Sequence, residues 1–146
     1  SNGLVSKRQN YIYQYDNHTP SKRVKLYTDT SVIPTPQLEV LLELQALLEF
    51  VIDKADDMKA RDIITLDLTG KSTITDAFVI CSGNSKRHVC AIAENVVMEM
   101  KHAGSPPLNI SGTEDGEWVV VDMGDVVLHV MQDASRDYFQ LEKLWG

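Results

Sequence analysis

Apolar residues recur along the chain first with the period of a helix. Residues 36–58 carry them three or four positions apart, and Thr35 precedes this stretch as a suitable N-cap. Pro36 suits the first helical turn, where no backbone donor is required. A second helical stripe fills residues 85–104 and a third covers about residues 135–144. The spacing therefore predicts three helices.

Shorter apolar segments lie between these helices and have the composition of strands. Residues 62–68 alternate between polar and apolar, whereas residues 77–81 are continuously apolar, as in a strand buried on both faces. Residues 108–111 form a short strand, and residues 118–131 read as a hairpin. The order α, β, β, α, β, β, β, α predicts an α/β (α+β) domain, with a mixed sheet of about five strands and flanking helices.

The hairpin has the most sharply defined geometry. If Gly124-Asp125 is its two-residue turn, side chains alternate between two distinct faces. One face is uniformly apolar and must be core; it holds Val119, Val121, Met123, Val126, Leu128 and Val130. The other face mixes chemical types and holds Trp118, Val120, Asp122, Val127, His129 and Met131. A mixed face of this kind is typical of a binding surface. Cover by the last helix, through Tyr138, Leu141, Leu144 and Trp145, is an equally good interpretation, and the two can coexist.

Residues 1–37 lack this regularity and contain three prolines. They predict a flexible or partner-ordered extension that precedes a domain at 38–146. Tyr11, Tyr13 and Tyr15 alternate with period two and could add a strand to another chain, although disorder is the expected state.

Charge is divided unevenly between these two parts. The chain has 14 basic and 21 acidic side chains, a net charge of −7. Residues 1–37 hold five basic and two acidic ones, which gives +3 there and −10 over residues 38–146. An acidic body favours a basic protein partner over nucleic acid. The short basic cluster at residues 22–25 resembles a nucleic-acid or nuclear-import patch, but such runs recur by chance.

Localisation follows from what the sequence lacks. No apolar run approaches the roughly 20 residues that span a bilayer. The N-terminal residues have neither the basic-then-apolar order of a secretory signal peptide nor the arginine-rich, acid-poor composition of an organellar transit peptide. A cytoplasmic protein is therefore expected.

Several residues invite a chemical interpretation. The turn at residues 82–85 could cradle an anion, but it lacks the known phosphate-loop patterns, so a plain turn with an N-cap is expected. The basic run at residues 86–88 opposes the macrodipole of its helix, which suggests an exposed cluster with a use. Cys81 could act as a nucleophile with His88 or His129 as its base, yet a buried structural cysteine is far commoner.

Metal and acid–base chemistry have weaker support. The four histidines are scattered and form no spaced metal motif, so no metal or cofactor is expected. Asp122 and Asp125 could be read as a pair of catalytic carboxylates. They flank a hairpin turn, however, where aspartate is common, so a structural role is expected.

Three ordered blocks carry a strong resemblance to a known family. They are TDAFVICSGNSKRHVCAIAENV at residues 75–96, GEWVVVDMGDVVLHVM at residues 116–131 and RDYFQLEKLWG at residues 136–146. Together they resemble the Iojap/ribosomal silencing factor family, over about residues 38–146. Departures are small: Ala77 replaces an aromatic, Met123 an aromatic or leucine, and Phe139 a frequent tyrosine.

The resemblance implies a ribosome-binding protein and not an enzyme. The family has a fold similar to nucleotidyltransferases, often forms homodimers, and binds the large ribosomal subunit through ribosomal protein fourteen at the face where the small subunit docks. Silencing is then steric, because the bound factor keeps the two subunits apart and so lowers translation. Organellar relatives assist assembly of the large subunit. The implied docking set is Trp118, Asp125, His129, Tyr138 and Trp145, supported by Glu117, Asp122, Asp137 and Leu141.

An enzyme of the nucleotidyltransferase type is the alternative from another class. In the sequences of such enzymes a Gly-Ser turn is followed, about one helix later, by an Asp-x-Asp pair that holds two metal ions. Ser82-Gly83 lies in a comparable place, but the sequence contains no Asp-x-Asp. Fold alone does not carry function, so this reading is the weaker one.

Overall fold

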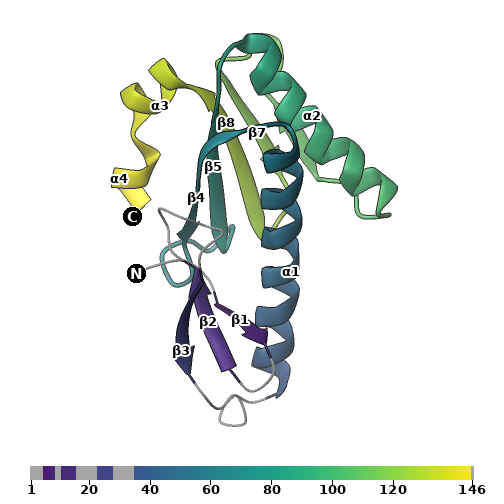
Figure 1. Ribbon diagram of the computed structural model, residues 1–146, viewed down its shortest axis with the longest axis vertical. Helices are drawn as coiled ribbons and strands as arrows, with labels where there is room; N and C mark the ends of the chain where they lie inside the picture. The colour runs from purple at the N-terminus through teal and green to yellow at the C-terminus, as the bar shows by residue number, and fades with distance from the viewer. Residues whose placement is uncertain (1–4, 9–10, 16–22, 28–34, 146) are drawn as a thin grey trace.

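A five-stranded mixed sheet is the centre of the fold (Figure 1). The computed structural model of the protein describes residues 5–8, 11–15, 23–27 and 35–145. Within the sheet the strand order is β4-β5-β8-β7-β6, with β5 and β8 parallel and the other neighbours antiparallel. The strands are β4 (Arg61–Asp67), β5 (Ala77–Gly83), β6 (Asn109–Ser111), β7 (Trp118–Asp122) and β8 (Val126–Gln132). This confirms the predicted fold class, and each strand ends within two residues of its predicted position.

Two long helices cover one face of this sheet, α1 (Thr35–Asp57) and α2 (Lys86–His102) (Figure 1). As predicted, Ser85 caps α2: its Oγ accepts a hydrogen bond from the His88 N–H at 3.1 Å. Gly104, with a φ of +78°, follows the C-terminus of α2. No helix in the described part of the chain is long and apolar enough to cross a membrane.

The predicted hairpin is confirmed residue by residue. Val119 pairs with Val130 and Val121 with Leu128, and the Met123 N–H donates to the Val126 carbonyl. The predicted apolar face is core: its five members other than Met123 are fully buried beneath α1 and α2, and Met123 packs against them. Register therefore decides which residues of β7 and β8 are left for the second face.

The C-terminus differs from the single helix that the sequence predicted. Two short helices, α3 (Asp133–Phe139) and α4 (Leu141–Trp145), are separated by Gln140 in the left-handed region, with φ 50° and ψ 51°. The Arg136 Nε donates to Glu142 Oε1 at 2.7 Å. In a continuous α-helix residues six apart lie about 120° apart around the axis and about 9 Å apart along it, so the break favours this contact. Leu141, which follows the break, packs into a hydrophobic cluster on the second face of the sheet. The other members of this cluster are Ile64, Leu66, Leu68, Ile80 and Met131.

The described residues of the N-terminal segment form a separate antiparallel sheet of order β1-β2-β3, and β1 lies against α1. The strands are β1 (Val5–Arg8), β2 (Tyr11–Tyr15) and β3 (Arg23–Tyr27). Tyr11, Tyr13 and Tyr15, whose period-two alternation allowed a strand, lie in β2. The flexible or partner-ordered character of residues 1–37 and the domain boundary at residue 38 stay predictions.

Burial on the helix-covered face of the sheet leads to a stability prediction. Leu128 is completely buried, whereas Leu108 is 74% exposed. We expect Leu128→Ala to lower the free energy of unfolding by about 2–5 kcal/mol, because it removes buried methyl groups and leaves a cavity. Leu108→Ala is the matched control and should change it by less than about 0.5 kcal/mol. Urea denaturation followed by circular dichroism measures both, and equal losses would contradict this account of the core.

Candidate functional site: an aromatic and acidic surface

The second face of the hairpin holds a tryptophan supported by a buried histidine. The Trp118 Nε1–H donates to the Nδ1 of His129 at 3.0 Å. Because Nδ1 accepts, the proton of a neutral His129 lies on Nε2. Trp118 is half-buried, while His129 is only 6% exposed. The predicted site residue His129 thus lies beneath the surface and fixes the position of the indole ring.

A chain of ring contacts extends from this pair to solvent. Phe78 meets the His129 ring edge-on at a centroid distance of 4.4 Å, and Phe139 lies 4.6 Å from the Trp118 ring. Tyr138 follows at 5.0 Å from Phe139 and is 82% exposed. These five residues form the aromatic cluster, which begins in the sheet and ends on α3. Its outer rings are held by inner ones, which limits the conformational entropy that binding would cost.

Two of the three predicted aspartates, Asp122 and Asp125, lie at the opposite end of the hairpin. Asp122 Oδ1 accepts the Gly124 N–H at 2.9 Å, and the exposed Asp125 forms the turn, where its carbonyl accepts the N–H groups of Asp76 and Ala77. A strand advances about 3.4 Å per residue, so Asp122 lies about 14 Å from Trp118 along β7. The surface is therefore elongated, with an aromatic end and an acidic end.

The remaining predicted residues occupy different positions. Glu117 is exposed beside Trp118, and Asp137 is exposed on α3. Leu141 is only 8% exposed and belongs to the core of the second face. The backbone of Trp145 ends α4, but its side chain lies outside the described part of the chain.

Sequence reasoning missed two members of the aromatic cluster, Phe78 and Phe139. Phe78 alternates with Ile80 along β5, and both lie on the second face, because Phe78 pairs with Val127 and Ile80 with His129. That pairing was invisible in the sequence, since β5 and β8 are far apart along the chain. Phe139 follows Tyr138, but its contact with Trp118 depends on how α3 returns over the sheet.

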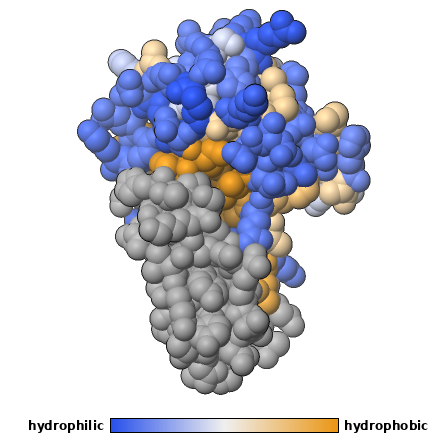
Figure 2. Space-filling model, viewed as in Figure 1, coloured by the Kyte–Doolittle hydropathy of each residue, from blue (hydrophilic) through white to orange (hydrophobic). Residues whose placement is uncertain are grey.

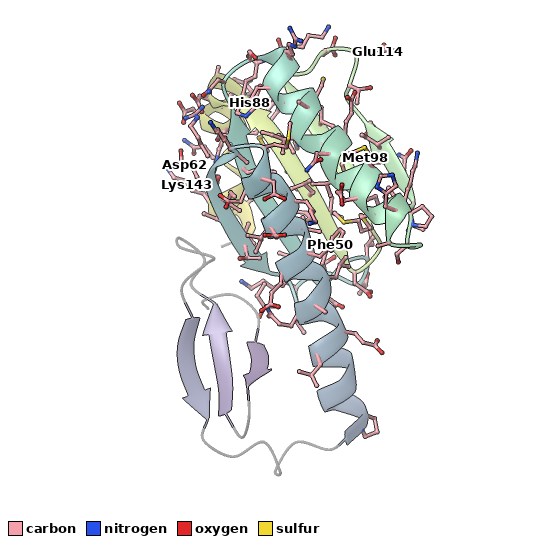
Figure 3. All side chains as sticks on the ribbon, turned by 45° about the vertical axis from the view of Figure 1, so that its right-hand side comes forward. Phe50, Asp62, His88, Met98, Glu114 and Lys143 are labelled. Carbon is pink, nitrogen blue, oxygen red and sulfur yellow. The ribbon has the colours of Figure 1, made fainter. Side chains whose placement is uncertain are left out.

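Polar contacts hold the C-terminal helices onto the sheet. Arg61 of β4 pairs with Asp133 at 2.9 Å, and the Arg136 Nη1 donates to the buried Ser82 Oγ at 2.8 Å. These residues line a pocket of about 820 Å³, which Asp62 and Lys143 also border (Figure 3). Both arginines already face carboxylates, so the pocket offers little uncompensated positive charge to an anion.

Cys81 is not available as a nucleophile, and His88, one of its two candidate bases, is held by other contacts. Burial raises the pKa of the Cys81 thiol to about 12, against a smaller lowering effect of Arg136, so the thiolate is absent at neutral pH. His88, labelled at the start of α2 in Figure 3, accepts the Asn84 N–H at Nδ1 and contacts the Met58 carbonyl through Nε2, each at 2.8 Å. Its ring therefore ties α2 to the end of α1. No three histidine, cysteine or acidic side chains gather as a metal site among the described residues.

The fold and this surface together define an α+β domain that presents a stiff patch of aromatic and acidic side chains. Hydrophilic residues cover most of the coloured part of the surface in Figure 2. The family profile described as "Ribosomal silencing factor during starvation" matches residues 42–146. The chain belongs to this ribosomal silencing factor family.

Relatives and solved structures agree with this assignment. The chain is 44% identical over 101 residues to the ribosomal silencing factor RsfS of Haemophilus influenzae, covering 69% of this chain and 99% of the relative. A mouse protein named "Mitochondrial assembly of ribosomal large subunit protein 1" is 30% identical over 132 residues, covering 88% of this chain and 57% of that protein. A crystal structure from Chromobacterium violaceum superposes with a TM-score of 0.70 at 41% identity, covering 72% of this chain and 88% of the other.

The buried position of His129 predicts a pH dependence of stability. Burial lowers its pKa from 6.5 to about 4, so between these values the unfolded chain binds more protons than the folded one. This contribution is fully present above pH 6.5 and is lost as the pH falls toward 4, by about 3 kcal/mol in total. As the pH is lowered from 6.5 to 4, the urea concentration at the midpoint of unfolding should fall less steeply for His129→Asn than for the wild type. The exposed His102 supplies the control: His102→Asn should keep the wild-type profile, and identical profiles for all three proteins would refute this role of His129.

Proposed function

We propose that this protein binds the large ribosomal subunit through ribosomal protein fourteen at the intersubunit face. Bound there, it sterically blocks the joining of the small subunit and so represses translation, and it catalyses no reaction. The observation that carries the proposal is the exposed end of the aromatic cluster, Tyr138 and Phe139, packed on Trp118 and flanked by acidic residues. Family membership supplies the ribosome as the setting.

The aromatic end provides the area that anchors a partner. Tyrosine and tryptophan are enriched among residues that dominate binding energy, because they bury large surfaces at a small entropic cost. Tyr138 is exposed and rests against Phe139, which in turn rests against Trp118. His129 and Leu141 take part indirectly in this proposal, because both are buried and position what lies above them.

Acidic side chains at both ends of the surface provide complementarity to a basic ribosomal protein. Asp125 is exposed at the hairpin turn, and Glu117 and Asp137 are exposed beside the aromatic cluster. Opposite charges across an interface speed encounter and fix orientation more than they raise affinity. This effect weakens with salt, because the Debye length at physiological ionic strength is about 8 Å.

Rigidity of the whole domain makes steric blocking effective. The docking face consists of a hairpin in the sheet and of helices held to it by Arg61–Asp133 and Arg136–Glu142. A domain bound through such a face keeps α1 and α2 in place on the far side of the sheet. An approaching subunit therefore meets a body that it cannot compress or displace without breaking the contact.

Substitutions at the two ends of the surface test the docking face. Tyr138→Ala and Asp125→Arg should each weaken binding to isolated large subunits by about tenfold or more, since they remove an anchor and reverse a complementary charge. Binding is measured by cosedimentation at graded salt. Met98→Ala and Asp56→Arg, exposed on α2 and α1, are the matched controls and should bind as the wild type does. Equal affinity of all five proteins would show that the surface is misplaced.

Subunit joining tests the steric step separately. Excess wild-type protein, mixed with purified large subunits before small subunits are added, should lower the joined fraction in a sucrose gradient. Asp125→Arg should lose this effect in proportion to its loss of affinity. A variant that binds large subunits as tightly as the wild type and still allows joining would contradict steric blocking.

A role in large-subunit assembly is the second candidate, favoured by the name and the long match of the mouse relative. It would use the same surface, and tighter association with precursor than with mature subunits would distinguish it.

A nucleotidyltransferase would need a metal-binding pair of carboxylates near Ser82-Gly83, and magnesium-dependent nucleotide turnover would be its sign. A cytoplasmic location and a homodimer stay predictions, for which cell fractionation and analytical ultracentrifugation are the measurements.

A further inference from the structure

Two large aliphatic side chains are exposed at the edge of the five-stranded sheet where the β7–β8 turn lies. Ile74, in the loop between β4 and β5, is 87% exposed, and Leu108, just before β6, is 74% exposed. Among the described residues, the other large apolar side chains that are more than half exposed, Tyr138 and Leu144, belong to the C-terminal helices. Exposed apolar groups that gather around polar ones mark protein–protein contact sites.

Hydrogen bonds place the two aliphatic residues on opposite sides of the β7–β8 turn. The Asp125 carbonyl accepts the Asp76 N–H at 2.9 Å, which joins the β4–β5 loop to one side of the turn. On the other side the Leu108 N–H donates to the Asp122 carbonyl at 2.8 Å, and a Cβ on Gly124 would lie 3.7 Å from Leu108 Cδ1. The strand order β5-β8-β7-β6 across this edge agrees, because the turn joins the two middle strands.

The β4–β5 loop is held by its own hydrogen bonds, so Ile74 has a defined position. Ser72 Oγ accepts the Ile74 N–H at 3.2 Å, and the next residue, Thr75, is buried. The Leu68 N–H donates to the Asp76 carbonyl at 2.8 Å, which closes the loop at its base. An exposed side chain on an ordered loop loses little backbone entropy when a partner binds it.

Aspartates lie between the two aliphatic residues. The loop and the turn, residues 67–76 and 122–125, hold four aspartates and one lysine, a net charge of −3. Asp67 Oδ1 and Asp122 Oδ1 each accept a backbone N–H two residues further along the chain, at 2.9 Å. The exposed carboxylate of Asp125 has no such partner in the described part of the chain, so it is available to a cation.

A carboxylate bordered by aliphatic groups suits the side chains of arginine and lysine, which combine an apolar stem with a charged end. An ion pair in contact with water contributes little to affinity, whereas apolar neighbours that exclude water strengthen it. We propose that Ile74, Leu108 and Asp125 together bind one arginine or lysine of the basic partner, and we call them the turn site. Asp125 binds the charged end, and the two aliphatic side chains shield the ion pair from water.

Charge and continuity favour a basic protein as the occupant of the turn site. The net negative charge of the loop and the turn repels phosphates, and it also repels the same edge of a second copy of this chain. The proposed docking surface ends at Asp125, so a partner seated on that surface already reaches the turn. This inference therefore rests on the proposed function, and it adds the chemistry by which the partner is recognised at that end.

Binding to isolated large subunits, measured by cosedimentation, tests the aliphatic part of the turn site. Ile74→Ala and Leu108→Ala should each weaken binding about threefold, because less apolar surface is then removed from water. Met98→Ala, which truncates an exposed apolar side chain on α2, is the matched control and should bind as the wild type does. All three side chains are exposed, so circular dichroism should show that each variant folds as the wild type does.

Coupling between the aliphatic pair and the carboxylate tests the shielding. Asp125→Asn should weaken binding about fivefold in the wild type and less than about twofold in the Ile74→Ala/Leu108→Ala background, since water there reaches the ion pair. The fivefold ratio should also change little as salt is raised from about 0.05 to 0.3 M, because an ion pair shielded from water is screened less.

Several outcomes would overturn the turn site. Equal losses from Asp125→Asn in the two backgrounds, or wild-type binding by both single alanine variants, would do so. If Tyr138→Ala still weakens binding in that case, the proposed docking surface stands, and if it does not, the docking surface fails as well. A change in the monomer–dimer equilibrium of Ile74→Ala in analytical ultracentrifugation, with unchanged binding to large subunits, would instead assign the aliphatic pair to a contact with a second copy.

Discussion

The antiparallel pairing of β7 with β8 through the Gly124-Asp125 turn is the constraint on which the structure depends. It assigns Val119, Val121 and their partners to the helix-covered core and leaves Trp118 and His129 on the opposite face. Side chains alternate along a strand, so a shift of one residue in register would exchange the two sets. A slip would bury Asp122 beneath the helices and expose the valines. The energetics of the core and the composition of the proposed docking face are thus set by the same turn.

The second face is stabilised by a different kind of interaction. A hydrogen bond from Trp118 to His129, ring contacts with Phe78 and Phe139, and ion pairs of Arg61 and Arg136 join the C-terminal helices to the sheet. Partly exposed ion pairs contribute little free energy singly. Here they fix the direction in which α3 leaves β8, and that direction determines whether Tyr138 extends the aromatic cluster.

The sequence by itself determined the elements whose patterns are local: the hairpin register, the Ser85 cap, the stop at Gly104, the buried β5 strand, and the family. Periodicity and turn residues act over a few positions, so they can be read directly. Tertiary structure alone decided the rest. It broke the last helix at Gln140, placed Phe78 against His129, and buried His129 and Leu141 beneath the surface. Each of these depends on contacts between segments distant in the chain, and no local pattern encodes which distant partner a residue will meet.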